Sequence, residues 1–283
     1  VIVGQDKIAD NKVYVFLTGK SSSKFSHISE VKSCKKQGTN VAKNVSIKLL
    51  AKDNTYGRTL KIAIPHVKIE VPVFVVFKAL GITKDKDILE KLLIDPDNSE
   101  NNYLLYWLKP SIEESSSILT QDEAVLYLLK QSLILGQPKD IKLSEEKKIE
   151  LFKGMLSRDL LPHTGSEFYK KALFLGYMIN KLAKCYFNQI NYDDRDSYCN
   201  KRVDSSGNLL AMLTRQYFNK FLKESRNCIM KELNSGPWKT SKNIENVINT
   251  TNIYKIFKTN TIEAGLKYGL ATGNWGIKTV SNK

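Results

Sequence analysis

The segment 193–202 holds the side chains whose types and spacing could do chemistry. Three carboxylates surround one arginine, and a basic pair follows: Asp193, Asp194, Asp196, Arg195 and Lys201–Arg202. Asp/Arg clusters of this kind form charge-assisted hydrogen bonds that tie down a connection between elements. The basic pair could bind a phosphate, because arginine offers a planar fork of donors and lysine a point charge. A solvated surface without a ligand is the alternative interpretation of that pair.

Sequence motifs for nucleotide binding or metal-assisted catalysis are absent from the 283 residues. Neither G-x-x-x-x-G-K-[ST] nor a dinucleotide-binding fingerprint occurs. No D-x-D-x-D run is present that could hold the paired Mg²⁺ ions of nucleotidyl transfer. The adjacent pairs Glu113–Glu114 and Glu145–Glu146 lie on separate segments. We therefore predict no catalytic residue, no metal site and no cofactor site in this chain.

Cysteine and histidine residues are scattered along the chain. The four cysteines are Cys34, Cys185, Cys199 and Cys228, and the three histidines are His27, His66 and His163. No C-x-x-C pair occurs, and no histidine stands at ligand spacing from a cysteine. We expect reduced structural thiols and hydrogen-bonded structural histidines in place of a zinc site or a disulfide framework.

The chain is strongly basic. It has 44 Lys and Arg against 29 Asp and Glu, which gives a formal net charge of +15. Such an excess favours a polyanionic partner, nucleic acid first and an anionic membrane surface second. The most apolar run, 71–80, is too short to span a bilayer and contains Lys78. Since no signal-peptide pattern occurs, we expect a soluble, intracellular chain, and Val1 in place of a methionine predicts a segment of a longer protein.

Two periodicities predict the elements that must position these side chains. Alternating β-branched and aromatic residues predict strands at Lys12–Leu17, Asn44–Ala51 and Arg58–Ile64, with a flexible turn at 18–24 and hairpin residues Asp53, Asn54 and Gly57. Helical periodicity predicts helices at Asp85–Ile94, 121–135 with a Thr120–Glu123 capping box, 145–161 capped by Ser144, Gly165–Ile190, Leu209–Leu233 and Thr261–Leu270. Gly207 is expected to break the chain before the helix at 209–233, and 235–252 is expected to be a mobile connection.

A tight turn is predicted after the last helix. Gly273 and Gly276 bracket Asn274 and Trp275, and glycine readily adopts the backbone angles that such a turn requires. Lys267 on the preceding helix could reach a nucleic acid. Trp275 could pack in the interior or stack on a base, and we favour packing because a buried tryptophan is the more common case.

Four motifs in the sequence resemble one known family. They are DDRD…NKR…G before LLA-x-L at 193–213, P-x-x-K-x-x-x-P-x-x-x-x-F-x-A-L-G-I at 65–82, K-A-x-F-L-G-Y-M-I-N at 171–180 and T-x-x-x-G-L-K-Y-x-L-A-T-G-N-W-G at 261–276. Together they resemble the second-largest subunit of multisubunit DNA-directed RNA polymerases, in its eukaryotic, archaeal and large-DNA-virus branch. The resemblance covers nearly the whole chain and is strongest at 58–82, 162–203 and 261–276.

The resemblance bears on the segment 71–77, for which propensity alone predicts a buried strand. In the family, the part of the signature after the second proline is helical. Pro72 at the first helical position and Gly81 just past the end suit a helix as well. We therefore predict a helix here.

The resemblance also implies a domain organisation. Residues 1–11 correspond to the end of the first protrusion segment, 12–202 to the lobe, 203–258 to the second protrusion segment and 259–283 to the start of the fork. The predicted fold class is α+β: a mainly helical lobe with a small antiparallel sheet, followed by a long helix from a second, protrusion domain.

In function, the resemblance implies part of a polymerase and a wall of the cleft that holds DNA. Lys201, Arg202 and Lys267 are then expected to bind nucleic acid. The catalytic aspartates of the family belong to the largest subunit, so Mg²⁺ and structural zinc are expected only in the complete polymerase. Expected partners are the largest and other polymerase subunits, the DNA template, the RNA–DNA hybrid and transcription factors, without a membrane. The expected location is the nucleus, or the cytoplasm or virion for a viral protein.

Two other classes of function stay open at this point. One is a stand-alone basic nucleic-acid-binding module. The other is a structural protein-interaction domain, whose positive charge would face acidic protein partners.

Overall fold

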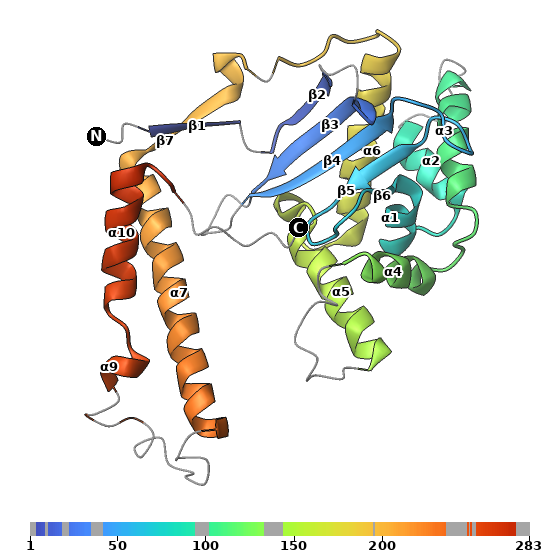
Figure 1. The fold of residues 1–283 in the computed structure, drawn as a ribbon. Coiled ribbons are helices and arrows are strands. Elements are labelled where there is room, and N and C mark those ends of the chain that lie inside the picture. The colour runs from blue at the N-terminus through green and yellow to red at the C-terminus, as the bar shows by residue number, and fades with distance from the viewer. Residues whose placement is uncertain are drawn as a thin grey trace. The chain divides into compact units, whose positions relative to one another are not determined.

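The computed structural model describes residues 4–8, 11–18, 23–34, 42–93, 102–132, 144–194, 196–235, 248, 250 and 253–275. The chain forms two compact units. One is Ile8–Lys201, and the other combines Val1–Lys7 with Arg202–Lys283. The first unit joins a sheet to a set of helices, and the second is built around two paired helices (Figure 1).

The first unit contains a five-stranded antiparallel sheet in the order β2-β3-β4-β5-β6. Its strands are β2 Val13–Leu17, β3 Phe25–Ser33, β4 Lys43–Leu50, β5 Leu60–Ala63 and β6 Val71–Pro72. Successive residues of a strand point to opposite faces, so aligned valines collect on one side of the sheet. Val31 lies opposite Val13 on one neighbour and Val45 on the other, and all three are buried.

Strand β3 is one of the elements that the sequence pattern missed. Two of its buried positions are Ser29 and Ser33, so the alternation of apolar and polar residues that marks a strand is weak here. The predicted hairpin between β4 and β5 is confirmed, with an antiparallel register and Gly57 at a φ of 109°.

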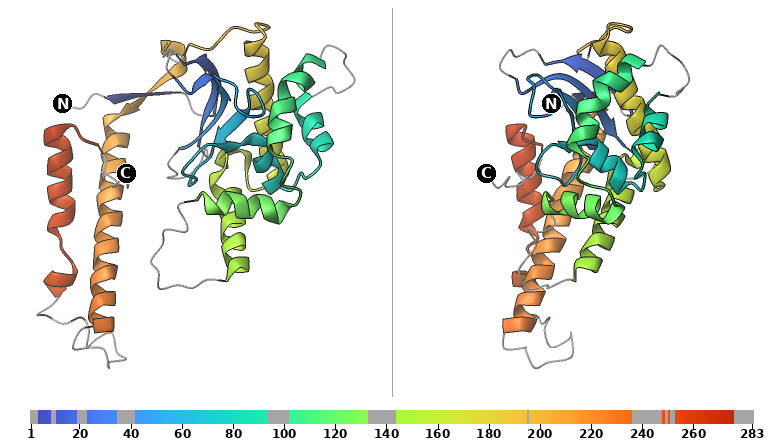
Figure 2. Two further views of the ribbon diagram at one scale, coloured as in Figure 1. Left: turned by 45° about the vertical axis from the view of Figure 1, so that its right-hand side comes forward. Right: turned by 90° about the vertical axis from the view of Figure 1, so that its right-hand side faces the viewer.

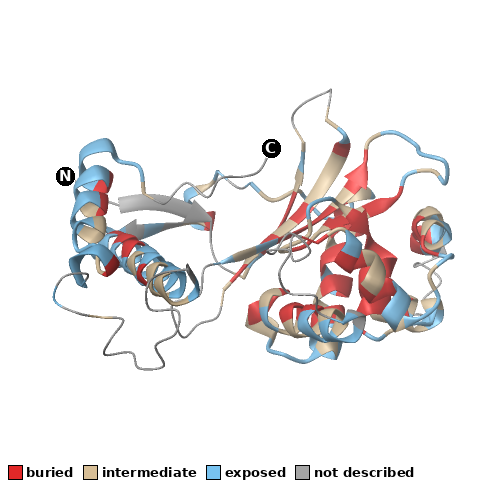
Figure 3. Cartoon of the chain, turned by 60° about the horizontal axis from the view of Figure 1, so that its bottom comes forward, coloured by how far each residue is buried: buried red, intermediate tan, exposed pale blue. Residues whose placement is uncertain are grey.

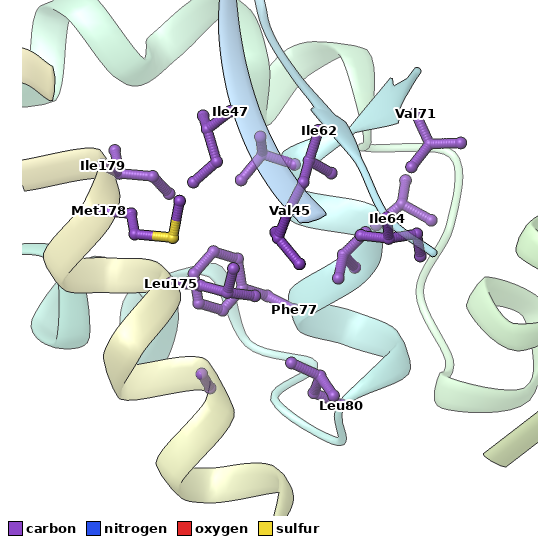
Figure 4. Packing of buried hydrophobic residues seen from close by; sticks show 14 of the residues in the cluster. Val45, Ile47, Ile62, Ile64, Val71, Phe77, Leu80, Leu175, Met178 and Ile179 are labelled. Atoms are coloured by element: carbon purple, nitrogen blue, oxygen red, sulfur yellow. The ribbon is translucent and has the colours of Figure 1, made fainter. Parts of the chain in front are cut away.

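Helices cover the apolar face of this sheet (Figure 2). They are α1 Val73–Ala79, α2 Asp85–Leu93, α3 Asn102–Glu114, α4 Gln121–Lys130, α5 Glu145–Asp159 and α6 Phe168–Tyr186. Buried residues concentrate between the sheet and these helices (Figure 3). In Figure 4, Val45, Ile47 and Ile62 of the sheet face Phe77 of α1 and Leu175 of α6.

Helix α1 is buried along its whole length, which explains its unusual sequence. All seven residues are buried, and Phe74 and Phe77 are fully enclosed. Each large apolar side chain buried in this way contributes about 1.5–3 kcal/mol. Apart from Lys78, this enclosed helix is apolar on every side, which is why strand propensity was misleading here. The prediction of a helix is confirmed, except that Pro72 is the N-cap residue and not the first helical residue.

Glycine ends α1 as predicted. Gly81 has a φ of 94°, its N–H donates to the Lys78 carbonyl, and Ile82 N–H donates to the Phe77 carbonyl at 3.2 Å. This pair of bonds satisfies carbonyls that a helix end leaves free.

Several helix boundaries differ from those predicted. The capping box of α4 is confirmed, with Glu123 N–H donating to Thr120 Oγ1 at 3.3 Å, but α4 ends at Lys130 because residue 132 bridges back to Val67. Ser144 is the N-cap residue of α5 without a side-chain bond. The helix predicted at 165–190 is shorter at both ends, and α3 was missed because Pro110 lies inside it.

Two fully buried lysines stabilise helix ends in this unit. Lys78 Nζ donates to the carbonyls of Ser115 and Ile118 at 3.0 and 2.9 Å, and lies 3.4 Å from an Asp85 carboxylate oxygen. Lys171 Nζ donates to the Leu160 carbonyl, where α5 ends. Each ammonium group thus satisfies the carbonyl of the residue that directly follows a helix, Ser115 or Leu160, where positive charge is favourable.

The second unit contains the long helix α7 Ser206–Ser235, the short helix α9 Ile253–Ile256 and α10 Asn260–Thr272. Gly207 was expected to break the chain, but it lies in the first turn of α7, where an added Cβ would meet nothing. Strands β1 Gly4–Ile8 and β7 Lys201–Ser205 pair with each other, so Lys201–Arg202 belongs to a strand, whereas the sequence predicted a loop over 192–202.

Helices α7 and α10 pack closely through two glycines one turn apart. A Cβ on Gly265 would lie 2.2 Å from the Tyr217 ring, and one on Gly269 would lie 2.7 Å from Leu213. The contacts run in opposite chain directions, so the two helices are antiparallel. Most of the connection predicted at 235–252 lies outside the described residues. Within the described parts of the chain, no helix is both long and apolar enough to cross a bilayer.

Candidate functional site

The segment 193–200, which precedes strand β7, is called the loop below. Its first residue is a carboxylate that covers the edge of the sheet. Asp193 Oδ2 accepts the Val15 N–H at 2.9 Å, and Asp193 N–H donates to the Val15 carbonyl at 2.8 Å. Lys181 Nζ donates to the same carboxylate oxygen at 2.6 Å and to the Val13 carbonyl at 2.7 Å. Because β2 is an edge strand, Asp193 and Lys181 satisfy backbone groups that would otherwise lack a partner.

The middle of the loop is a turn held by side chains. Asp194 Oδ1 accepts the Asp196 N–H at 2.9 Å, which is the geometry of an Asx turn. Asn200 Nδ2 donates to the Asp194 carbonyl at 2.6 Å, and Lys12 Nζ donates to Asn200 Oδ1 at 2.5 Å. Both ends of this short loop are therefore bonded to residues in or next to strand β2.

The predicted basic pair begins strand β7. Lys201 Nζ lies 3.7 Å from Asp196 Oδ1, and its side chain is 24% exposed, whereas that of Asp196 is 97% exposed. An ion pair with so exposed a carboxylate is weak, so a phosphate could compete for the lysine. Only the backbone of Arg202 lies within the described residues.

Arg195 lies outside the described residues, so its expected role as the centre of the carboxylate cluster stays a prediction. Within the described part of the loop, Asp193 binds Lys181, and Asp196 approaches Lys201. The two carboxylates thus pair with one lysine that precedes the cluster in sequence and one that follows it.

Aromatic and histidine side chains hold Tyr192, the residue before the loop. His27 Nε2 is 3.0 Å from the Tyr192 hydroxyl, and its Nδ1 is 2.9 Å from Ser26 Oγ. The His27 ring also packs edge-on against Tyr186 at 5.1 Å between centroids. Burial, with a smaller effect from the charge of Arg58, lowers the pKa of His27. With both ring nitrogens engaged, His27 serves as a structural residue here.

The predicted turn after α10 is present in part. Gly273 has a φ of 71°, Asn274 N–H donates to Thr272 Oγ1 at 3.3 Å, and Asn274 Nδ2 donates to the Tyr268 hydroxyl at 3.3 Å. Trp275 is half-buried, and Gly276 lies outside the described residues. The turn therefore folds back onto the end of its own helix.

Lys267 belongs to the second unit and is strongly exposed. Its side chain is 77% exposed and forms an ion pair with Glu263 at 2.7 Å, one turn earlier on α10. Exposed basic residues also lie along α7: Arg215, Lys220, Lys223, Arg226 and Lys231. The structure thus brings Asp193, Asp194 and Lys201 together in the loop and the first residue of β7, and Lys267 lies in another unit.

Sequence patterns missed three residues of the loop network: Lys12, Lys181 and Asn200. Asn200 was visible only as a letter of the N-K-R motif, and neither lysine lies near it in sequence. In the part of the chain that the structure describes, no group of three or more His, Cys, Asp or Glu side chains could hold a metal ion.

Comparisons with known proteins agree with these motifs. The family model described as RNA polymerase Rpb2, domain 2, matches residues 9–204. The DNA-directed RNA polymerase II subunit RPB2 of Eremothecium gossypii is 33% identical over 279 residues, which is 98% of this chain and 21% of the relative. DNA-directed RNA polymerase II subunit 2 of Arabidopsis thaliana is 32% identical over 283 residues, 98% of this chain and 22% of the relative.

An archaeal relative matches over a similar span. The DNA-directed RNA polymerase subunit Rpo2 of Saccharolobus solfataricus is 31% identical over 278 residues, 97% of this chain and 22% of the relative. The chain thus spans about a fifth of the length of the curated relatives that it matches.

Proposed function

Because this chain belongs to the RNA polymerase Rpb2 family, we propose that it is part of the second-largest subunit of a DNA-directed RNA polymerase. In this proposal, residues 12–202 are the lobe, 203–258 the second protrusion segment and 259–283 the start of the fork. The chain forms part of a cleft wall that holds DNA during transcription. Its partners are the largest and other polymerase subunits, the DNA template, the RNA–DNA hybrid and transcription factors.

The observation that carries the proposal is the anchored loop before Lys201–Arg202. Asp193 and Asn200 bond both ends of the loop to strand β2 or the residue before it, so the chain reaches Lys201 from a point fixed on the sheet. A positive group fixed in this way can neutralise a phosphate at little cost in conformational entropy. The net charge of +15 gives the field that attracts a polyanion.

Nucleotide transfer is assigned to the complete polymerase and not to this chain. Mg²⁺ and structural zinc would be held by parts of the polymerase outside residues 1–283. The residues of this chain contribute by binding and by orientation. The proposed location is the nucleus, or the cytoplasm or virion for a viral protein.

The proposal is tested by changing Lys201 and Arg202 to alanine in the full-length subunit within its assembled polymerase. Non-specific duplex binding rests on phosphate contacts, with dissociation constants on the order of 10⁻⁴–10⁻⁶ M. The double variant should retain its melting temperature and flatten the salt dependence of DNA binding by about one to two units. The matched control is Lys109→Ala with Lys170→Ala, two lysines of α3 and α6 in exposed ion pairs.

A contrary result is early melting with an unchanged salt slope, which would make Lys201–Arg202 a structural clamp. Equal flattening by the control variant would show that only total charge matters. For the alternative of a stand-alone module, the reading frame beyond Lys283 decides, because downstream hybrid-binding and clamp regions would exclude it. For the protein-interaction alternative, preference for an acidic peptide over DNA is the deciding measurement.

A further inference from the structure

Asn200 is a buried amide that uses its side-chain donor and its side-chain acceptor. Its side chain donates to the Asp194 carbonyl at 2.6 Å and accepts from Lys12 Nζ at 2.5 Å. Its own N–H donates to the Ser197 carbonyl at 2.9 Å, and the Tyr14 hydroxyl lies 3.5 Å from its carbonyl oxygen. Only 8% of the residue is exposed. Bonds on both sides of a buried amide restrict the local chain conformation, because each lost bond would leave a polar group without a partner.

The bonds of Asn200 act at the point where the chain enters strand β7. Asn200 directly precedes Lys201, the first residue of strand β7. Its bonds connect that point to Lys12, which immediately precedes strand β2. The far end of the loop is bonded to the same strand through Asp193 and Val15. Hydrogen bonds therefore hold the loop at both ends, and Asn200 forms those next to the basic pair.

The Lys12 ammonium group has uncharged neighbours. It donates to the neutral amide oxygen of Asn200 and lies 5.3 Å from the centroid of the Tyr14 ring. No carboxylate forms an ion pair with Lys12 among the described residues. A hydrogen bond from a charged donor to a neutral acceptor is strong, and the amide oxygen of Asn200 does not neutralise the lysine.

We propose that Asn200 is a positioning residue for nucleic-acid binding, which holds the chain at Lys201 in place for phosphate through its bonds to Lys12 and Asp194. This inference rests on the proposed function of the basic pair. It goes further because it assigns the geometry of that contact to a neutral buried amide and to a lysine 188 positions away in sequence.

The test uses salt-titrated binding of duplex DNA by the full-length subunit in its assembled polymerase, with melting measured in parallel. Asn200→Ala should flatten the salt slope by roughly one unit, as Lys201→Ala does. The double variant Asn200→Ala with Lys201→Ala should have a salt slope no flatter than that of the more affected single variant, because both changes remove the same phosphate contact. The matched control is Asn180→Ala, another buried asparagine of this unit, which donates to the Leu92 carbonyl at 2.9 Å. It should lower the melting temperature without changing the slope.

A second variant covers the case in which Asn200→Ala does not fold. Lys12→Met removes the ammonium donor at an exposed position and leaves the Asn200–Asp194 bond in place. Its effect on the slope should vanish in the Lys201→Ala background. An additive loss there would mean that Lys12 binds its own phosphate, and it would overturn the positioning role.

The outcomes separate this inference from the proposed function. If Lys201→Ala flattens the slope and neither Asn200→Ala nor Lys12→Met does, the positioning role is wrong and the basic pair keeps its assignment. If Lys201→Ala also leaves the slope unchanged, the assignment of the basic pair fails, and the inference fails with it.

Discussion

The two units of the chain differ in what they bury. The α+β unit, Ile8–Lys201, encloses two lysines and satisfies them with carbonyl oxygens at helix ends. The helical unit buries few side chains and leaves large apolar residues of α7 on its surface: Leu210, Met212, Phe218, Leu222 and Met230. One unit therefore depends on internal hydrogen bonds within a large core. The other depends on the close fit of two helices.

The difference in burial determines which substitutions should destabilise each unit. A large core contributes enough hydrophobic free energy to enclose a charged group, but that group must then keep its partners. A helix pair with little core tolerates polar changes on its surface, but it does not tolerate added volume at its contact. Substitutions of opposite kinds should therefore affect opposite units.

The largest effect is expected in the α+β unit at Lys78. Lys78→Met keeps most of the volume but removes the donor of the Ile118 carbonyl, one of the two donors of the Ser115 carbonyl and the cation beside Asp85. The free energy of unfolding should fall by about 3–5 kcal/mol, the usual result of removing one partner of a buried charged group. Denaturant unfolding measures this loss, and hydrogen exchange should show it in α1, α3 and the sheet.

The control for Lys78 is Lys86→Met, an exposed lysine of α2, which should change stability by less than about 0.5 kcal/mol. A loss of under about 1 kcal/mol at Lys78 would show that the core does not need this ammonium group. The contrast between the two units would then be incorrect.

The next largest effect is expected in the helical unit at Gly265. Gly265→Ala places a Cβ 2.2 Å from the Tyr217 ring, so the two helices must move apart. We expect a loss of about 2–3 kcal/mol from overpacking. Hydrogen exchange should increase in α7 and α10 and stay unchanged in the sheet of the other unit.

The matched control is Gly154→Ala in α5, where an added Cβ meets nothing within 4 Å. Alanine there should stabilise the α+β unit by about 0.5–1 kcal/mol, because it favours the helix over the unfolded chain. Faster exchange throughout both units after Gly265→Ala would contradict the idea that the helical unit depends on its own contact.

A smaller effect is expected at the edge of the sheet. Asp193→Ala removes the acceptor of Val15 N–H and leaves half-buried Lys181 without its carboxylate. Thermal unfolding should show a loss of about 1–2 kcal/mol. Asp196→Ala is the control within the same loop, since that side chain is almost fully exposed, and it should cost less than about 0.5 kcal/mol. Equal losses from both would mean that the edge contact has no special role.

Local sequence patterns predicted the features that depend on neighbouring residues. The Thr120–Glu123 capping box, the end of α1 at Gly81 and the positive φ of Gly273 each involve residues a few positions apart. Patterns of this range can be recognised in a sequence because the interacting groups are close along the chain.

Features that depend on distant residues could not be predicted in this way. Strand β7 pairs with β1 across nearly 200 positions, and the bond from Lys12 to Asn200 spans 188. Lys78 looked like an interruption of an apolar run, yet it is buried because carbonyls of the connection after α3, 37 and 40 positions away, bind its amine. The motifs therefore located the candidate site, and tertiary contacts determine which residues hold it together.

The smallest expected effect is a dependence of stability on pH, confined to the α+β unit. Burial lowers the pKa of His163, with a smaller effect from the charge of Lys171, and its Nδ1 is 2.7 Å from Ser33 Oγ. The pKa of His27 is lowered in the same direction. The unfolded chain then binds protons more readily than the folded one. Stability is fully present above about pH 6.5 and is lost as pH falls from there toward the folded pKa.

Each histidine can contribute at most about 1.4 kcal/mol per pH unit, and solvent screening of half-exposed rings reduces this further. The double variant His27→Gln with His163→Gln should therefore flatten the fall in melting temperature between pH 7.5 and 6.0. Hydrogen exchange in α7 and α10 should not respond to pH in this way, after correction for intrinsic exchange rates, because both histidines lie in the other unit. A melting temperature that rises as pH falls would reverse the expected sign and show that these rings gain stability on protonation.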